Sequence, residues 1–111
     1  MNWTSSLTNE ADLAKILQAS YETPQVIFKH STRCSISSMA KNRLERSDNP
    51  ESIQFNLLDL ITYRDMSKTV AENFKVPHES PQVLLIKNGE CIYDESHNGI
   101  RMEEILEEAK R

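Results

Sequence analysis

Continuous apolar runs limit the folds that this chain can adopt. Residues 26–28 (Val-Ile-Phe) and 83–86 (Val-Leu-Leu-Ile) contain no alternating polar residues, and this pattern is typical of strands buried on both faces of a sheet. The predicted strands cover residues 26–29, 53–60, 82–86 and 90–94, and the last two are joined by Asn88-Gly89, a strong signal for a tight hairpin turn. Such a sheet needs helices on both sides.

Four segments with apolar residues at helical spacing supply that cover. The first begins at Leu7 and ends before Thr23, and the second runs from Cys34 to about Arg46. The third covers about residues 64–74, and the fourth starts near Arg101. Thr8 or Ser6 is the predicted N-cap of the first helix. Residues 48–50 (Asp-Asn-Pro) are predicted to break the second.

The predicted order of elements is αβαβαββα over one domain, residues 1–111. The first two strands and the helix between them form a βαβ unit, whose strands pair in parallel through a right-handed crossover. The last two strands form an antiparallel hairpin. The resulting α/β fold, a central mixed four-stranded sheet flanked by helices, resembles the thioredoxin-like domains.

Composition excludes several classes of partner. A formal net charge of −4 argues against nonspecific binding of nucleic acid. The longest apolar run, residues 83–86, is too short to span a membrane, and the first residues lack the pattern of a secretory signal. Two cysteines without an export signal indicate reduced thiols in the cytoplasm. We expect a monomer. We also expect no bound metal, since no His or Cys pair has the spacing of a zinc site.

Cys34 lies where the first predicted strand gives way to the second predicted helix. Unpaired N–H groups and the positive end of the helix dipole stabilise negative charge there, so the thiolate is favoured and the residue is predicted to be reactive. The preceding Arg33 adds positive charge. The alternative is a small buried hydrophobic residue, although the Ser, Thr, Arg and Ser around Cys34 are poor core residues.

Ser37 occupies the position, three residues after Cys34, where a dithiol oxidoreductase has its resolving cysteine. A mixed disulfide on Cys34 therefore has no local thiol to resolve it. The Ser37 hydroxyl is predicted either to hydrogen-bond the thiolate or to be a solvated first-turn serine. Cys91, near the hairpin turn, is predicted to lie too far from Cys34 for a disulfide and to serve packing.

Residues distant in sequence are predicted to converge on Cys34. In thioredoxin-like domains a cis-proline before the third strand lies against the active-site cysteine, and the residue before it presents backbone groups to a peptide. This resemblance assigns a cis bond to Ser80–Pro81, against the alternative of an ordinary trans proline. Counting along the hairpin places His97 near Pro81, either as a group that binds ligand or exchanges protons, or as a surface histidine.

Three motifs together resemble the monothiol bacilliredoxin family, thioredoxin-like proteins of the bacillithiol redox system. They are the reactive segment with its Cys-x-x-Ser ending, the string His-Glu-Ser-Pro-Gln at residues 78–82, and Ser96-His97. The resemblance extends from about Trp3 to the last helix, and the string at 78–82 is its most specific part. Where the family commonly has Thr-Cys-Pro-Ile-Ser, this chain has Arg33 and Ser35 in place of the Thr and the Pro.

The resemblance implies that Cys34 takes bacillithiol, or a similar low-molecular-weight thiol, from S-thiolated proteins and is reset by a second thiol, as part of cell redox homeostasis. The small thiol is then a co-substrate, and no bound cofactor is expected. Arg33, Lys41 and His97 are expected to meet the acidic portion of that thiol. Two other functions remain open: a redox-inactive thioredoxin-like binding module, and a glutaredoxin-like iron–sulfur carrier, whose Cys-Gly-Phe-Ser signature this chain lacks.

Overall fold

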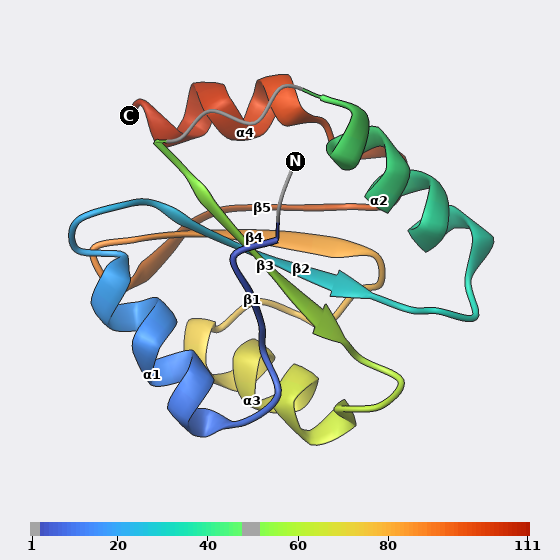
Figure 1. Cartoon of the computed structure of the whole chain (residues 1–111), viewed down its shortest axis with the longest axis horizontal. Helices are drawn as coiled ribbons and strands as arrows, with labels where there is room; N and C mark the ends of the chain where they lie inside the picture. Colours follow the sequence, from blue (N-terminus) through green and yellow to red (C-terminus); the bar gives the residue numbers. More distant parts are fainter. Residues whose placement is uncertain (1–2, 48–51) are drawn as a thin grey trace.

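A computed structural model describes residues 3–47 and 52–111, in which a mixed sheet lies between helices (Figure 1). The elements are, in chain order, β1 (Ser5–Ser6), α1 (Glu10–Ala19), β2 (Gln25–His30), α2 (Ser35–Arg46), β3 (Gln54–Asp59), α3 (Arg64–Phe74), β4 (Gln82–Lys87), β5 (Glu90–Ser96), the 3₁₀ turn η1 (His97–Gly99) and α4 (Met102–Ala109). The predicted helix break at residues 48–50 lies outside the described residues.

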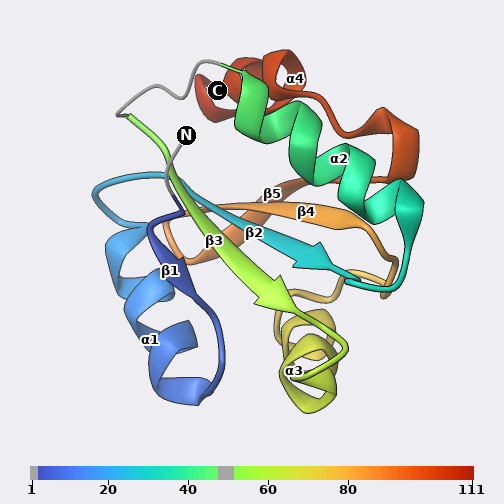
Figure 2. The ribbon, with the colours of Figure 1, turned by 45° about the vertical axis from the view of Figure 1, so that its right-hand side comes forward.

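The sheet has the strand order β1-β3-β2-β4-β5. Strands β1, β3 and β2 are parallel, and β4 and β5 are antiparallel to their neighbours. Helices α2 and α4 cover one face and α1 and α3 the other (Figure 2). The predicted parallel βαβ unit and the antiparallel hairpin are therefore confirmed, and β2 lies in the middle of the sheet.

The middle strand β2 is buried on both faces, as its uninterrupted apolar run predicts. Val26 and Phe28 belong to the apolar cluster that α2 and α4 complete, whereas Ile27 belongs to the cluster under α1 and α3. All three side chains are fully buried. Burying three such side chains contributes several kcal/mol to the free energy of folding, and this fixes the position of the segment that follows β2.

The prediction of a four-stranded sheet was wrong by one strand. Ser5–Ser6 pairs in parallel with β3, and the N–H groups of Thr4 and Leu7 donate to the carbonyls of Phe55 and Leu57 at 2.7 and 2.8 Å. Two serines carry no apolar alternation, so nothing in their side chains predicts a strand. Backbone hydrogen bonds add this edge strand, together with one side-chain bond from the Ser5 hydroxyl to Asn56 Oδ1 at 2.6 Å.

The first helix begins later than predicted. Its N-cap is Asn9, whose side chain accepts a hydrogen bond from the N–H of Asp12 at 2.9 Å, rather than Thr8 or Ser6. Thr8 instead donates through its N–H and its hydroxyl to the Asp12 carboxylate. All three residue types are good caps, so composition alone does not choose among them.

The hairpin turn between β4 and β5 forms at Asn88 and Gly89, as predicted, and both residues have positive φ values, 54° and 78°. The Tyr21 side chain lies against Gly89, where a Cβ would be 2.6 Å from the Tyr21 hydroxyl. Ser20 accepts hydrogen bonds from both turn N–H groups, through its carbonyl and its hydroxyl. The turn is thereby attached to the end of α1.

At the other end of the sheet, the carboxyl ends of β2 and β3 meet the start of β4. His30 is level with Asp59, Lys29 is level with Gln82, and the Leu60 N–H donates to the His30 carbonyl at 3.0 Å. Three connecting segments therefore lie at this end of the sheet: residues 31–34, residues 60–63 and the segment that precedes Gln82. Polar residues concentrate at this edge.

Candidate functional site

Cys34 is the N-cap residue of α2, with extended backbone angles. Its N–H donates to the Ser31 carbonyl at 3.1 Å, and its own carbonyl accepts from Ser38 at the same distance, so a tight turn leads from β2 directly into the helix. The residue is partly exposed. No acidic residue lies in the first turn of α2.

Ser37 is completely buried, which rules out a solvated first-turn serine. Its Oγ accepts a hydrogen bond from the Ser31 N–H at 2.9 Å and lies 2.7 Å from Nδ1 of His30. Because Oγ already accepts from Ser31, its own hydrogen is available to donate to His30 Nδ1. The hydroxyl thus connects the first turn of α2 to the end of β2, across the loop that carries Cys34.

His30 lies below this loop as a neutral, stacked ring. Burial lowers the pKa of His30, and the charge of Lys41 lowers it further. The His30 ring stacks on Phe28 with centroids 5.8 Å apart, and Phe28 stacks on Trp3 at 5.9 Å. A neutral His30 that accepts at Nδ1 carries its hydrogen on Nε2. The stack is a rigid base for the cysteine loop.

The ammonium of Lys41, which we expected to meet a ligand, makes contacts within the chain. Its ammonium lies 2.8 Å from the Glu45 carboxylate and 5.9 Å from the centroid of the Trp3 ring. Glu45 also accepts from the Trp3 indole N–H at 2.8 Å. These contacts attach the N-terminal segment to α2, and the positive charge of Lys41 is paired with Glu45.

Arg33, the other predicted cation, is exposed beside Cys34. Its guanidinium makes no hydrogen bond or ion pair with the other residues that the structure describes.

The Ser80–Pro81 peptide bond is cis, as predicted. The Pro81 carbonyl accepts from the N–H of His97 at 3.0 Å, which confirms the predicted proximity of these two residues. The imidazole of His97 is about half exposed, with Nε2 3.8 Å from a Glu79 carboxylate oxygen. His97 is therefore attached by its backbone, while its ring remains accessible at the edge of the site.

Arg43 is a structural contributor that the sequence did not reveal. From α2, its guanidinium donates to the carbonyls of His97 and Ile100 at 3.2 and 3.1 Å. The residue that begins the 3₁₀ turn, His97, has a left-handed φ of 56°, and Arg43 holds this turn against the helix that starts at Cys34. A lone arginine on the polar face of a predicted helix carries no signal for such a contact.

Cys91 lies at the hairpin end of β5, as predicted, and packs against the apolar cluster under α1 and α3. Its thiol donates to the Tyr93 carbonyl at 3.3 Å. Burial raises the pKa of Cys91 to about 11, so the thiol stays protonated at neutral pH. Cys91 and Cys34 are both free.

Lys29 and His78 form a second polar contact that sequence analysis missed. Lys29 is fully buried in β2, and its ammonium lies 3.3 Å from Nδ1 of His78, which is also 3.3 Å from the Ser67 hydroxyl. Burial lowers the pKa of Lys29 to about 8. The only available signal was a lysine inside an otherwise apolar strand. Ser80 Oγ and Gln82 Oε1, close by in sequence, are buried without a partner among the described residues.

Comparison with known proteins agrees with this architecture. A putative oxidoreductase with a thioredoxin fold is 24% identical, with a TM-score of 0.82 over 96% of this chain and 94% of that one. The thioredoxin of Malassezia sympodialis is 16% identical, with a TM-score of 0.77 over 98% and 93% of the two chains. Fasciola hepatica thioredoxin is also 16% identical, with a TM-score of 0.75 over 97% and 98%. These likenesses confirm the thioredoxin-like fold.

A family model described as "Monothiol bacilliredoxin BrxC" matches residues 5–105. This range includes Cys34, Ser37, the Ser80–Pro81 bond and His97. In the described part of the chain, no helix has the length and apolar character needed to cross a bilayer, and no three His, Cys, Asp or Glu side chains gather as a metal site would require.

Proposed function

The chain belongs to the monothiol bacilliredoxin family, and hence to the thiol redox proteins, and from this premise we propose that it removes a low-molecular-weight thiol from protein mixed disulfides. Bacillithiol, or a thiol of similar chemistry, is the proposed co-substrate. The substrates are S-thiolated proteins, and the acting form is a monomer in the cytoplasm, where thiols are kept reduced. Cys34 is the only proposed nucleophile.

The reaction consists of two thiol–disulfide exchanges. The Cys34 thiolate attacks the small-thiol sulfur of a protein mixed disulfide and forms a new disulfide with the small thiol. The original S–S bond breaks, its electron pair leaves on the protein sulfur, and that sulfur takes up a proton from water. A second small thiolate then attacks the small-thiol sulfur on Cys34, which releases the Cys34 thiolate and a symmetrical small-thiol disulfide.

The observation that carries this proposal is the separation of the two cysteines. Cys34 lies at the start of α2, whereas Cys91 lies at the hairpin end of the sheet with a protonated, partly buried thiol. The position one turn after Cys34 is taken by the buried Ser37. A chain built this way can carry a small thiol on Cys34 but has no adjacent thiol for making an internal disulfide.

The remaining site residues are assigned supporting roles. Ser37 positions the Cys34 loop through its bonds to Ser31 and His30. Ser80 and Pro81 are proposed to contact the incoming disulfide, Ser80 through its backbone groups. Arg33 and His97 are proposed to meet the negative charge of the small thiol, because both carry exposed polar atoms at this edge.

Intact mass spectrometry after incubation with bacillithiol disulfide or glutathione disulfide tests the proposal. We expect one adduct on the wild type, the same adduct on Cys91→Ser, and none on Cys34→Ser. Wild-type protein that forms no adduct would instead be a redox-inactive binding module. An adduct retained on Cys34→Ser would show that Cys34 is not the exchanging residue.

A further inference from the structure

A cavity of about 330 Å³ opens between α3 and the segment that leads into β4. Leu60 and Ala71 contribute apolar walls, while Arg64 and Lys68, one helical turn apart on α3, bring two positive charges to it. Both cations are exposed and make no ion pair with other residues of the described chain. The whole chain carries a net charge of −4, so the two cations give this cavity a charge opposite to that of the chain.

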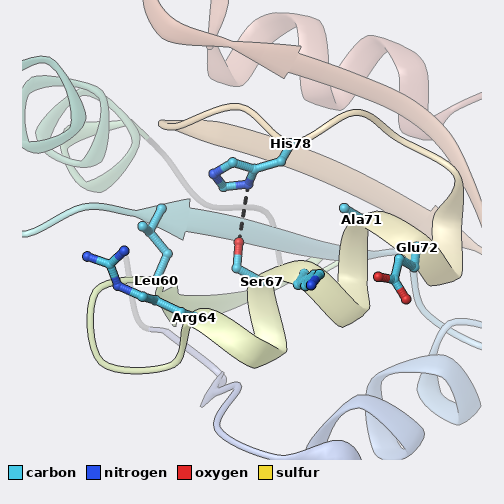
Figure 3. A pocket seen from close by; sticks show the side chains of 7 residues that line it. Leu60, Arg64, Ser67, Ala71, Glu72 and His78 are labelled. Carbon is cyan, nitrogen blue, oxygen red and sulfur yellow. Dashed lines mark hydrogen bonds between the residues drawn. The ribbon is translucent and has the colours of Figure 1, made fainter.

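His78 adds a hydrogen-bond donor to the same cavity. Its Nδ1 faces the buried Lys29 ammonium and the Ser67 hydroxyl, both 3.3 Å away. Since an ammonium only donates, Nδ1 must accept, and the ring hydrogen is therefore on Nε2. Figure 3 shows this second nitrogen turned away from Ser67, toward the side of the pocket where Leu60 and Arg64 lie.

The only acidic residue in the lining is Glu72. It lies at the opposite end of the cavity from Arg64, beyond Ala71 (Figure 3). The cavity therefore combines a guanidinium, an ammonium and an imidazole N–H beside apolar surface. Guanidinium groups bind carboxylates through paired hydrogen bonds, and an adjacent ammonium strengthens this binding.

The cavity belongs to the same edge of the sheet as Cys34. The N–H of its wall residue Leu60 is bonded to the carbonyl of His30, and the Cys34 N–H is bonded to Ser31, the residue after His30. A tight turn limits the Cα atoms of Ser31 and Cys34 to within about 7 Å, and one more residue adds about 4 Å. His30, one backbone hydrogen bond from the cavity wall, is thus no more than about 11 Å from Cys34.

We propose that this cavity binds a carboxylate of the low-molecular-weight thiol whose sulfur is exchanged at Cys34. Arg64 and Lys68 supply the charge, and the His78 Nε2–H supplies a directed donor. Lys29 is a positioning residue that holds the His78 tautomer from beneath. The inference rests on the proposed function and adds to it a selectivity for anionic small-thiol disulfides over neutral ones.

Two disulfides of different charge test the site: glutathione disulfide, which carries carboxylates, and bis(2-hydroxyethyl) disulfide, which is neutral. The rate of adduct formation on Cys34 is followed by mass at low salt. The test protein carries Arg64→Ala with Lys68→Ala. The matched control carries Lys15→Ala with Lys110→Ala, which removes the same charge from exposed positions outside this cavity.

We expect the test protein to lose about tenfold or more in rate with glutathione disulfide, as the loss of charged hydrogen bonds predicts, and less than twofold with the neutral disulfide. The control should change less than twofold with either. Equal losses with both disulfides, an equal loss in the control, or no loss at all would each overturn the carboxylate site. A wild type that reacts with neither disulfide would instead overturn the proposed function itself.

Discussion

The two cysteines of this chain have opposite surroundings at opposite ends of one sheet. Cys34 begins a helix at the edge where β2, β3 and β4 meet, and is partly exposed above buried polar groups. Cys91 lies on a strand against an apolar cluster, and burial keeps it protonated. In our proposal Cys34 is the reactive cysteine, whereas the partial burial of Cys91 disfavours its thiolate.

The largest expected effect concerns Cys91, at the hairpin end of the sheet. With a pKa of about 11, Cys91 is about 0.01% thiolate at pH 7, against about 3% for an unperturbed thiol, so it should react with iodoacetamide about 300-fold more slowly than N-acetylcysteine. The measurement uses Cys34→Ser protein, with the same protein in denaturing urea as the control. A native rate within tenfold of the free thiol would remove the contrast between the two ends.

The next effect tests the polar groups under the Cys34 edge. Lys29 has its pKa lowered from 10.5 to about 8 by burial, so the unfolded chain binds more protons between these values. The free energy of unfolding should therefore rise with pH over this range, by up to about 3 kcal/mol from this residue alone. Lys29→Met removes that term.

Urea unfolding of wild type and Lys29→Met at pH 7 to 10 gives the difference directly. Cys91, whose raised pKa acts in the opposite direction above pH 9, is present in both proteins and cancels. The exposed Lys15→Met is the control and should show a difference from wild type that is constant with pH. A flat difference for Lys29→Met as well would mean that Lys29 is not buried as a cation.

The third prediction concerns Ser37, which bonds to residues at the start of the loop that carries Cys34. Ser37→Ala leaves the Ser31 N–H and the His30 ring without their buried partner and should cost about 1–3 kcal/mol of stability. Ser38→Ala, the exposed neighbour in the same helical turn, should change stability by less than about 0.5 kcal/mol. Equal effects of the two substitutions in thermal or urea unfolding would show that Ser37 does not hold the loop.

The smallest effect is expected at the exposed rim. His97 and Glu79 lie 3.8 Å apart with both side chains about half exposed, and such pairs contribute little. Glu79→Gln should therefore change the free energy of unfolding by less than about 0.5 kcal/mol at pH 6 and at pH 8. A larger loss would mean that the His97–Glu79 pair has a structural role at this edge.

Local patterns in the sequence were sufficient for most elements. The helix at residues 64–74 was predicted with its observed limits, because its apolar stripe ends at Phe74, just before Pro77. The strand at Ser5–Ser6 was missed because it forms through backbone bonds to β3, which no side-chain pattern reports. Edge pairing depends on a partner far along the chain.

In the candidate site, too, some features could be predicted from local sequence and others could not. The place of Cys34 at the start of α2 and the cis bond at Pro81 were predicted, because each is set by its own element or by the family resemblance. The bonds of Ser37 to His30 and Ser31 were not predicted. Lys29–His78 and Arg43–His97 were missed, since each joins two segments whose approach is determined only by the sheet register. Charged residues are usually solvated, so a sequence gives no reason to pair these particular ones.

The fate of the small thiol on Cys34 tests the central claim most directly. Wild-type protein is loaded with glutathione, separated from excess reagent and followed by intact mass without added thiol, beside Ser37→Cys, in which a second thiol lies one turn away. We predict that the wild-type adduct persists until an external thiol is added, while the variant releases glutathione and forms an internal disulfide. Spontaneous loss from the wild type at the rate of the variant, with a Cys34–Cys91 disulfide as product, would contradict the separation of the two cysteines on which the proposed function depends.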